Sequence, residues 1–317
     1  MNGTITDPSL PLFTVNPNHE LVIIGTVYIV LASGNIPVYA FIIYVLTTDK
    51  ELNANPQYRL MNQISVVDSA QSFFHMLSGF FIIFPQIQIE WQGFVRVCGT
   101  TLNSLWLALF PLMVVLSINR ILVICNVVSA NEFPFASKVV MLLGWLYIIG
   151  IWLYGCITQN MTLSGVGWGY DFSKVGSDTL SALEWYFCFP SLLVTYIAYL
   201  VIVIRLKMTK SGQVGLRKNR ESRILVQATL LCSYMSTLIV FWHNAEFWLP
   251  ATDVAIAVLN CVWIFFGYLN PALLVILNAT IRKKTFALFS PATVTISAVS
   301  TASKMNSKRN ASSQLSK

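Results

Sequence analysis

Residues 98–120 read CGTTLNSLWLALFPLMVVLSINR. The stretch contains no charged side chain until Arg120, which ends it. A helix needs roughly 20 mostly apolar residues to cross a hydrocarbon core about 30 Å thick. This segment therefore predicts a transmembrane helix with an arginine at one end.

Six further stretches have a similar character, although the second and sixth spans are more polar. When the stretch quoted above is extended to residue 125, the expected spans are 21–46, 58–84, 98–125, 137–158, 181–206, 223–248 and 252–277. The connections are mostly short, which favours a bundle of antiparallel neighbours. We predict an all-α integral membrane protein with one seven-helix domain over 21–277, an N-terminal tail over 1–20 and a last segment over 278–317.

Composition excludes the main alternatives to a membrane protein. The 317 residues are 56% hydrophobic and 10% charged, with mean hydropathy +0.66. A soluble domain carries about 25% charged residues, and a disordered chain has few aromatic residues, whereas this one has 13%. The net charge of +7 belongs to a membrane-facing surface, and nucleic acid is not an expected partner.

The positions of Lys and Arg predict the orientation. With the N-terminus outside, the cytosolic segments hold 18 of the 20 basic residues, and the outside keeps only Arg96 and Lys174. Residues 1–20 lack Lys, Arg and a continuous apolar core, so we do not expect a cleavable signal peptide. Sequons at Asn2 and Asn160 lie on the expected outer side and are candidate glycosylation sites, whereas those at Asn278 and Asn310 should be silent.

Several polar residues lie within the predicted spans, where an unpartnered polar group is costly. The candidates for a switch are Asn35, Asp68, Asn119, Arg120, Asn270 and Pro271. Pro271 frees backbone groups and makes the seventh helix bendable. Two interpretations stay open: a hydrogen-bond network that only holds the bundle together, and one that also switches.

These residues give the chain a resemblance to the rhodopsin-like G-protein-coupled receptors. The matching positions are Gly34-Asn35 in the first span, Asp68 in the second, Ser117-Ile118-Asn119-Arg120 in the third, Trp145 in the fourth, Pro190 in the fifth and Asn270-Pro271-Ala272-Leu273-Leu274 in the seventh. The resemblance implies a receptor without cofactors that signals to a heterotrimeric G protein.

The chain departs from that family's pattern in informative places. Asn119 stands where an acid would restrain Arg120, and Leu274 replaces the seventh-helix tyrosine. The sixth helix reads FWHNAEFWLP and has no proline at the position where the family carries one, in the motif Cys-Trp-x-Pro. This mixture is similar to the nematode serpentine chemoreceptors of the Srx and Srt type. Cys98 lies deeper than the family's disulfide cysteine and loop 159–180 has none, so mostly buried free thiols are expected.

The predicted cytosolic face is strongly basic. Candidate G-protein contacts are Arg120, Arg205, Lys207, Arg217, Lys218 and Arg220. Anchoring to anionic lipid is the alternative for the loop residues. After the seventh span, Ile281, Phe286 and Phe289 fall on one side of a short amphipathic helix, and the Ser/Thr-rich tail beyond residue 290 is expected to be disordered.

The outer half of the bundle collects aromatic and polar residues, as a small-molecule site requires. The candidate ligand-binding residues are Gln71, His75, Asn103, Trp106, Tyr186, Trp242, His243 and Glu246, with Phe74, Glu184 and Trp185 nearby. An aromatic belt at the membrane interface is the alternative explanation, and is favoured for Trp185 and Trp248.

Two ligand classes look unsuitable from the sequence. There is no Lys in 252–277 to hold retinal, and the position where related receptors hold an amine is Leu102. We therefore expect an uncharged or weakly polar molecule. The predicted protein is a plasma-membrane chemoreceptor, with a sensory cilium as a candidate location, and not an enzyme. The alternatives are a membrane-embedded metal-dependent hydrolase, with His75, His243 and either Glu246 or Asp68 as zinc ligands, and a small-solute transporter.

Overall fold

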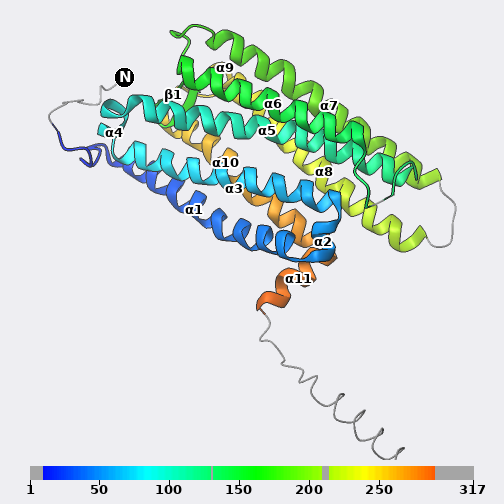
Figure 1. The fold of residues 1–317 in the computed structure, drawn as a ribbon. Coiled ribbons are helices and arrows are strands. Elements are labelled where there is room, and N and C mark those ends of the chain that lie inside the picture. The colour runs from blue at the N-terminus through cyan, green and yellow to red at the C-terminus, as the bar shows by residue number, and fades with distance from the viewer. Residues whose placement is uncertain (1–9, 130, 209–213, 290–317) are drawn as a thin grey trace, which may run out of the picture.

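Seven long helices form the body of the protein. The computed structural model describes residues 10–129, 131–208 and 214–289. Within them the long helices are α1 His19–Thr48, α3 Pro56–Ile83, α5 Gln92–Ile124, α6 Phe135–Thr158, α7 Ser177–Met208, α8 Val214–His243 and α10 Asp253–Leu277. They lie side by side with their long axes nearly aligned (Figure 1). The predicted seven-helix bundle is confirmed.

Short elements occupy the connections and the end of the bundle. They are α2 Lys50–Ala54, α4 Gln86–Glu90, β1 Met161–Ser164, β2 Gly167–Tyr170, α9 Ala245–Trp248 and α11 Ala279–Phe289. The helix α11 coincides with the predicted amphipathic helix. Its Ile281 is buried, whereas Phe286 points outward, so the two do not share one face in the way that the sequence predicted.

Local capping explains where several helices begin. Asn18, Asn55 and Thr252 each accept a hydrogen bond from a backbone N–H in the first turn of the helix that follows. Pro56 then occupies the first helical position of α3, where its missing N–H costs nothing. These polar caps lie at the ends of the apolar segments and fix the limits of the spans.

The sixth span differs from the prediction of one helix over 223–248. The helix α8 ends at His243, and α9 begins at Ala245. The Asn244 side chain donates to the Val240 carbonyl, and the backbone carbonyl of Asn244 accepts from the backbone N–H groups of Phe247 and Trp248. Because this residue uses its hydrogen bonds to close one helix and start another, the span breaks there.

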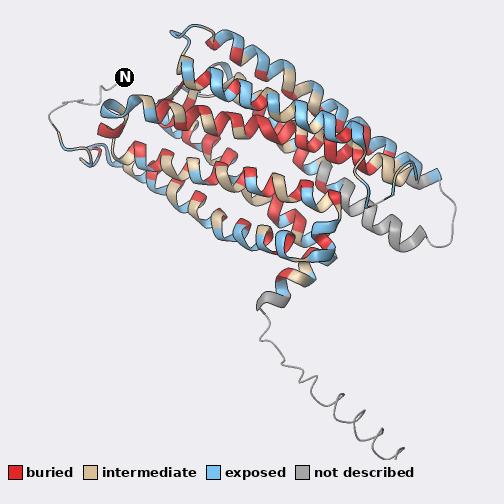
Figure 2. Ribbon diagram, in the orientation of Figure 1, coloured by how far each residue is buried: buried red, intermediate tan, exposed pale blue. Residues whose placement is uncertain are grey.

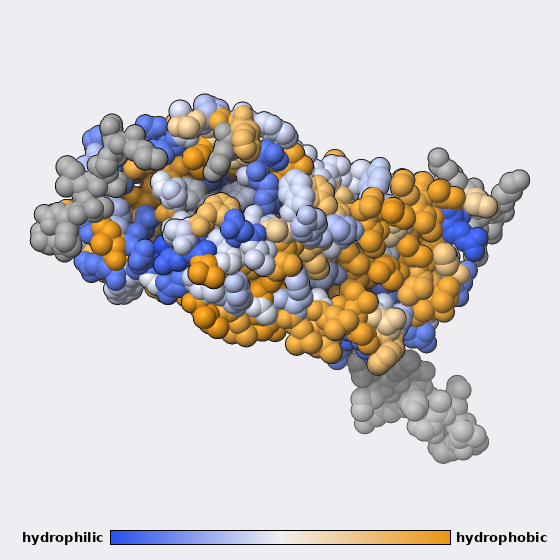
Figure 3. Space-filling view, turned by 90° about the horizontal axis from the view of Figure 1, so that it is seen from above, coloured by the Kyte–Doolittle hydropathy of each residue, from blue (hydrophilic) through white to orange (hydrophobic). Residues whose placement is uncertain are grey.

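Burial and hydropathy divide the bundle into a core and a lipid-facing surface. The helix α5 is buried along most of its length and packs against α3, α6 and α7 (Figure 2). The helix α6 exposes Leu142, Leu143 and Leu146, which would be a liability in water. Figure 3 shows apolar residues over much of the flank, with hydrophilic residues gathered toward the end that carries α4 and β1.

The lengths of the helices agree with this division. Among the described residues, six helices are long and apolar enough to cross a membrane, and α8 has a shorter apolar stretch, Thr229–His243. An outward apolar surface, with the polar side chains of the spans turned into an otherwise apolar core, is the arrangement expected of a multi-pass membrane protein.

Two glycines set the distance between α1 and α3. A Cβ at Gly79 would overlap the carbonyl oxygen of Gly25, and a Cβ at Gly25 would lie 2.8 Å from the carbonyl oxygen of Gly79. Small residues allow membrane helices to approach closely and gain van der Waals contact. This contact brings the polar residues of α1 and α3 within reach of one another.

We predict that Gly79→Ala lowers the thermal unfolding temperature of the purified receptor. Overpacking a tight contact costs about 1–3 kcal/mol, more than the 0.5–1 kcal/mol, roughly, that a helical glycine gains on replacement by alanine. Gly150→Ala is the matched control because nothing lies within 4 Å of its added Cβ. Equal unfolding temperatures for the two variants would show that the α1–α3 approach is not tight.

Candidate functional site

The connection between α6 and α7 forms a hairpin that enters the outer end of the bundle. The antiparallel strands β1 and β2 pair Met161 with Tyr170 and Ser164 with Gly167. The indole Nε1 of Trp168 donates to Ser78 Oγ at 2.7 Å, and its ring lies where a Cβ on Gly99 would be. The hydroxyl of Tyr28 donates to the Val166 carbonyl at 3.0 Å. The hairpin is thereby held between α1, α3 and α5.

A chain of hydrogen bonds joins this hairpin to α5 and α7. The Tyr170 hydroxyl donates to Glu184 Oε2 at 2.5 Å and accepts from Asn103 Nδ2 at 2.8 Å. The Nε2 atom of His243 lies 3.9 Å from Glu184 Oε1, which is too long for a hydrogen bond. Three elements therefore bring polar groups to one buried carboxylate.

An aromatic cluster lies beside that carboxylate. The Trp263 ring lies edge-to-face against those of Trp106 and Trp242, with centroids 5.6 and 5.0 Å apart, and His75 contacts it at 4.8 Å. A cavity of about 10 Å³ is lined by Asn103, Trp106, Glu184, Leu238, Ile239, Trp242 and Trp263. We call it the outer cavity. The indole Nε1 of Trp263 and the Nε2 atoms of both histidines have no hydrogen-bond partner.

The structure brings together several of the residues predicted to bind ligand. Asn103, Trp106 and Trp242 line the outer cavity, His243 lies beside Glu184, and His75 lies behind Trp263. Gln71 is buried on α3 but does not line the cavity. The side chain of Glu246 falls outside the described part of the chain, although its backbone lies in α9.

Tyr186 does not join this group, which corrects the sequence prediction. Its side chain is 75% exposed, whereas Glu184 is 3% exposed and Trp185 is 36% exposed. Consecutive helical residues turn by about 100°, so only one of these three neighbours can face the interior. The ring of Trp185, which the sequence assigns to an interfacial belt, lies edge-to-face against that of His243 with centroids 5.0 Å apart.

Sequence reasoning missed Tyr170 and Trp263 as neighbours of the cavity. Trp263 could have been found, because Trp263 and Phe266 lie on the same helical face as Asn270. Tyr170 could not, since nothing local predicts that a loop residue reaches Asn103, 67 residues earlier in the chain.

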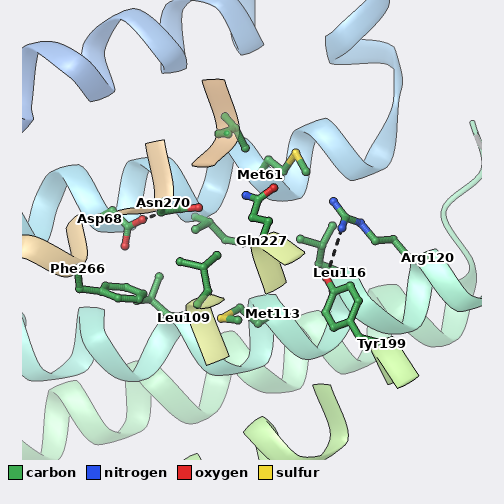
Figure 4. Close-up of a pocket in the computed structure, with 13 residues that line it drawn as sticks. Met61, Asp68, Leu109, Met113, Leu116, Arg120, Tyr199, Gln227, Phe266 and Asn270 are labelled. Carbon is green, nitrogen blue, oxygen red and sulfur yellow. Dashed lines mark hydrogen bonds between the residues drawn. The ribbon is translucent and has the colours of Figure 1, made fainter. Parts of the chain in front are cut away.

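A second cavity lies toward the other end of the bundle (Figure 4). Its volume is about 40 Å³, and its lining combines polar residues (Asp68, Arg120, Tyr199, Gln227 and Asn270) with apolar ones (Met61, Ile64, Leu109, Met113, Leu116, Leu231, Phe266 and Leu274). We call it the inner cavity. It contains three of the predicted switch residues, Asp68, Arg120 and Asn270.

Asp68 is the centre of a polar network in the bundle. Its Oδ2 atom accepts from Tyr39 Oη at 2.9 Å and from Asn270 Nδ2 at 2.8 Å. Tyr39 is also 2.7 Å from the Gly267 carbonyl, and Asn35 Nδ2 lies 3.5 Å from the Ile264 carbonyl. The predicted Asp68–Asn270 contact is present, and Tyr39 is a member that the sequence did not indicate.

Arg120 lies across the inner cavity from this network. It is 4% exposed, and its Nη1 is 3.4 Å from the Tyr199 hydroxyl on α7. The neighbouring Asn119 is fully buried, and neither polar atom of its amide has a hydrogen-bond partner. In Figure 4, Gln227 extends from α8 between Asn270 and Arg120. Among the side chains that the structure describes, the hydrogen-bond partner of the arginine is thus the neutral hydroxyl of Tyr199.

At the cytosolic end in the predicted orientation, α11 is held against the α1–α2 segment by ion pairs. Lys284 Nζ lies 2.6 Å from Asp49 and 3.0 Å from Glu51. The hydrogen bond from Lys284 holds the pKa of the Asp49 carboxyl below its ordinary value. These ion pairs connect α11 to the α1–α3 turn and fix its position beside the bundle.

Other predicted site residues are placed as follows. Arg205 is exposed near the end of α7, whereas the side chains of Lys207, Arg217, Lys218 and Arg220 fall outside the described residues. Asn2 also lies outside them. Asn160 is 0% exposed at the start of the hairpin, which leaves no room for a glycan, so we no longer expect glycosylation there. The six cysteines are free thiols, and among the residues that the structure describes no three His, Cys, Asp or Glu side chains converge as a metal site requires.

The fold defines the class of protein. The structure resembles the crystal structure of squid rhodopsin with a TM-score of 0.62, at 16% identity over 87% of each chain. The family follows from the sequence as a whole. Residues 13–298 match the model of the serpentine type 7TM GPCR chemoreceptor Srt, and the chain belongs to that family. This confirms the resemblance inferred from the motifs. None of the curated proteins compared with the chain matches it.

We predict that Tyr170→Phe loosens the hairpin, because the change leaves Asn103 Nδ2 and a carboxylate oxygen of Glu184 without their partner. An unpaired buried polar group costs about 1–3 kcal/mol. Amide hydrogen exchange over residues 161–170 should become faster. Tyr186→Phe, which removes an exposed hydroxyl from the same end of the receptor, should leave it unchanged. Unaltered exchange in Tyr170→Phe would show that the hydrogen-bond chain does not hold the hairpin.

Proposed function

We propose that this receptor binds a small extracellular molecule at the outer cavity and relays the event to a heterotrimeric G protein at the opposite end. Support comes from how the two cavities are built. The helices α5, α7, α8 and α10 line both of them. A displacement of any of these helices at one cavity therefore also moves side chains that line the other cavity.

A direct side-chain contact also links the two cavities, and it is the observation that carries the proposal. Trp106 lines the outer cavity and packs edge-to-face on Phe266 at 5.6 Å, and Phe266 lines the inner cavity. Closely packed interiors transmit displacement because they contain little free volume. A ligand that shifts Trp106 consequently shifts the wall of the Asp68–Arg120 region.

The helix α8 is the element best suited to move. Its outer end carries Trp242 and ends beside the break at Asn244, and its inner part carries Gln227. A ligand that binds the rearranged bundle better than the resting one shifts the population toward it. Movement of α8 would take Gln227 away from Arg120 and open the inner cavity to a partner.

The basic residues of the cytosolic face form the proposed surface for the G protein. We assign G-protein contact to Arg120 together with Arg205, Lys207, Arg217, Lys218 and Arg220. Their positive charge also suits the anionic inner leaflet, so lipid anchoring is the competing role for the loop residues. We further propose a plasma-membrane location with the N-terminal tail outside, in a sensory cilium where the cell has one.

The structure bears on whether the ligand is charged. The sequence favours an uncharged molecule because Leu102 stands where related receptors carry an acid. The structure places the carboxylate of Glu184 in the lining of the outer cavity. An acid is therefore available to a ligand from α7.

The test is G-protein activation in cells that express the receptor, challenged with a panel of volatile and water-soluble small molecules. We predict a ligand-dependent signal that Arg120→Ala abolishes at equal surface expression, because the variant loses the buried cation of the inner cavity. Arg59→Ala removes an exposed arginine from the same end and should retain the signal. A full response from a well-expressed Arg120→Ala receptor would contradict the proposed route.

A further inference from the structure

Glu184 is a buried acid that has no close Lys or Arg among the described side chains. Its side chain is 4% exposed and accepts a hydrogen bond from the neutral Tyr170 hydroxyl. Within the described part of the chain, no Lys or Arg lies within ion-pair distance of it, and His243 Nε2 is 3.9 Å from its second oxygen. A buried carboxylate needs a compensating partner, since desolvation of an unpaired charge is expensive.

The walls around this acid are suited to a positive charge. Trp106, Trp242 and Trp263 all line the outer cavity with Glu184. The faces of aromatic rings attract cations, and tryptophan attracts them most strongly. The remaining walls include Leu238 and Ile239, which offer apolar contact to methyl groups rather than hydrogen bonds.

We propose that the outer cavity recognises a compact organic cation of the methylated-ammonium class. The Glu184 carboxylate supplies the counter-charge, and the three tryptophans enclose the alkyl groups. This inference rests on the proposed function and specifies its ligand. It differs from the expectation based on Leu102, because the acid comes from α7 and not from α5.

The cavity must widen to admit such a cation. Its volume of about 10 Å³ is close to that of one water-sized body. The wall that can yield is the one that Trp242 forms, since α8 ends at the next residue, His243, and the helix breaks at Asn244. A cation inserted between Glu184 and this wall would displace the outer end of α8, which is the movement that the proposed relay requires.

Choline and its neutral isostere 3,3-dimethylbutan-1-ol provide the test, because they share one shape and differ in charge. Binding would be measured on the purified full-length receptor by thermal shift and by tryptophan fluorescence. We expect choline to bind at least tenfold, roughly, more tightly than the isostere, the size of effect that a desolvated cation–π contact and a counter-charge together supply. Tetramethylammonium should behave as choline does.

Glu184→Gln is the variant that removes the charge and keeps the shape. It should abolish the preference for choline, whereas Glu20→Gln, an exposed acid at the same end, should keep it. Equal affinity of the wild-type receptor for choline and the isostere, or binding of neither, would overturn the proposal without requiring any variant to fold. So would a Glu184→Gln receptor that still prefers choline.

The outcome for the ligand is separable from that for the proposed function. The binding measurement contains no G protein, so a choline preference without cellular signalling would count against coupling alone. A cellular response to a neutral molecule, with no preference for choline in the binding measurement, would retain the receptor function and reject the cation.

Discussion

The hydrogen bonds that converge on the Asp68 carboxylate connect three helices of this receptor. Tyr39 from α1 and Asn270 from α10 donate to the same oxygen of an acid on α3. A carboxylate enclosed by helices is costly unless such donors surround it. The close approach of α1 and α3 at Gly25 and Gly79 makes this convergence possible. The inner cavity lies beside it, so the same interaction that holds the helices also forms a wall of the predicted signalling site.

The buried charged side chains of the outer and inner halves of the bundle have different kinds of hydrogen-bond partner. The inner half uses Asp68 and Arg120 with neutral partners, while the outer half uses a hairpin that carries Tyr170 into the bundle and onto Glu184. The aromatic contact of Trp106 with Phe266 lies between them. Both halves keep buried polar atoms without a hydrogen-bond partner, among them the Asn119 amide and the Trp263 indole N–H, and packing connects the two.

Sequence alone predicts the spans because the apolar segments are long and their ends carry caps and charges. It also identifies Asp68, Asn270 and Arg120, since polar residues in hydrocarbon are conspicuous. It fails where the answer depends on chain geometry: the break at Asn244, the direction of Tyr186, and the arrival of Tyr170 from a loop. Tyr39 and Tyr199 escape notice because a tyrosine in a span has an ordinary role at an interface, and only the packed bundle shows its hydroxyl on an acid or an arginine.

We propose that the Asp68 network, which lines the inner cavity together with Arg120, is a two-state element rather than a fixed structural brace. Asp68→Asn tests it most directly, because an amide can keep the shape and both donors while it removes the charge. Basal G-protein activation per surface receptor would be measured beside the unfolding temperature. We expect a clear change in basal activation with little change in unfolding temperature. A lower unfolding temperature with unchanged activation per receptor would contradict it and leave Asp68 a purely structural residue.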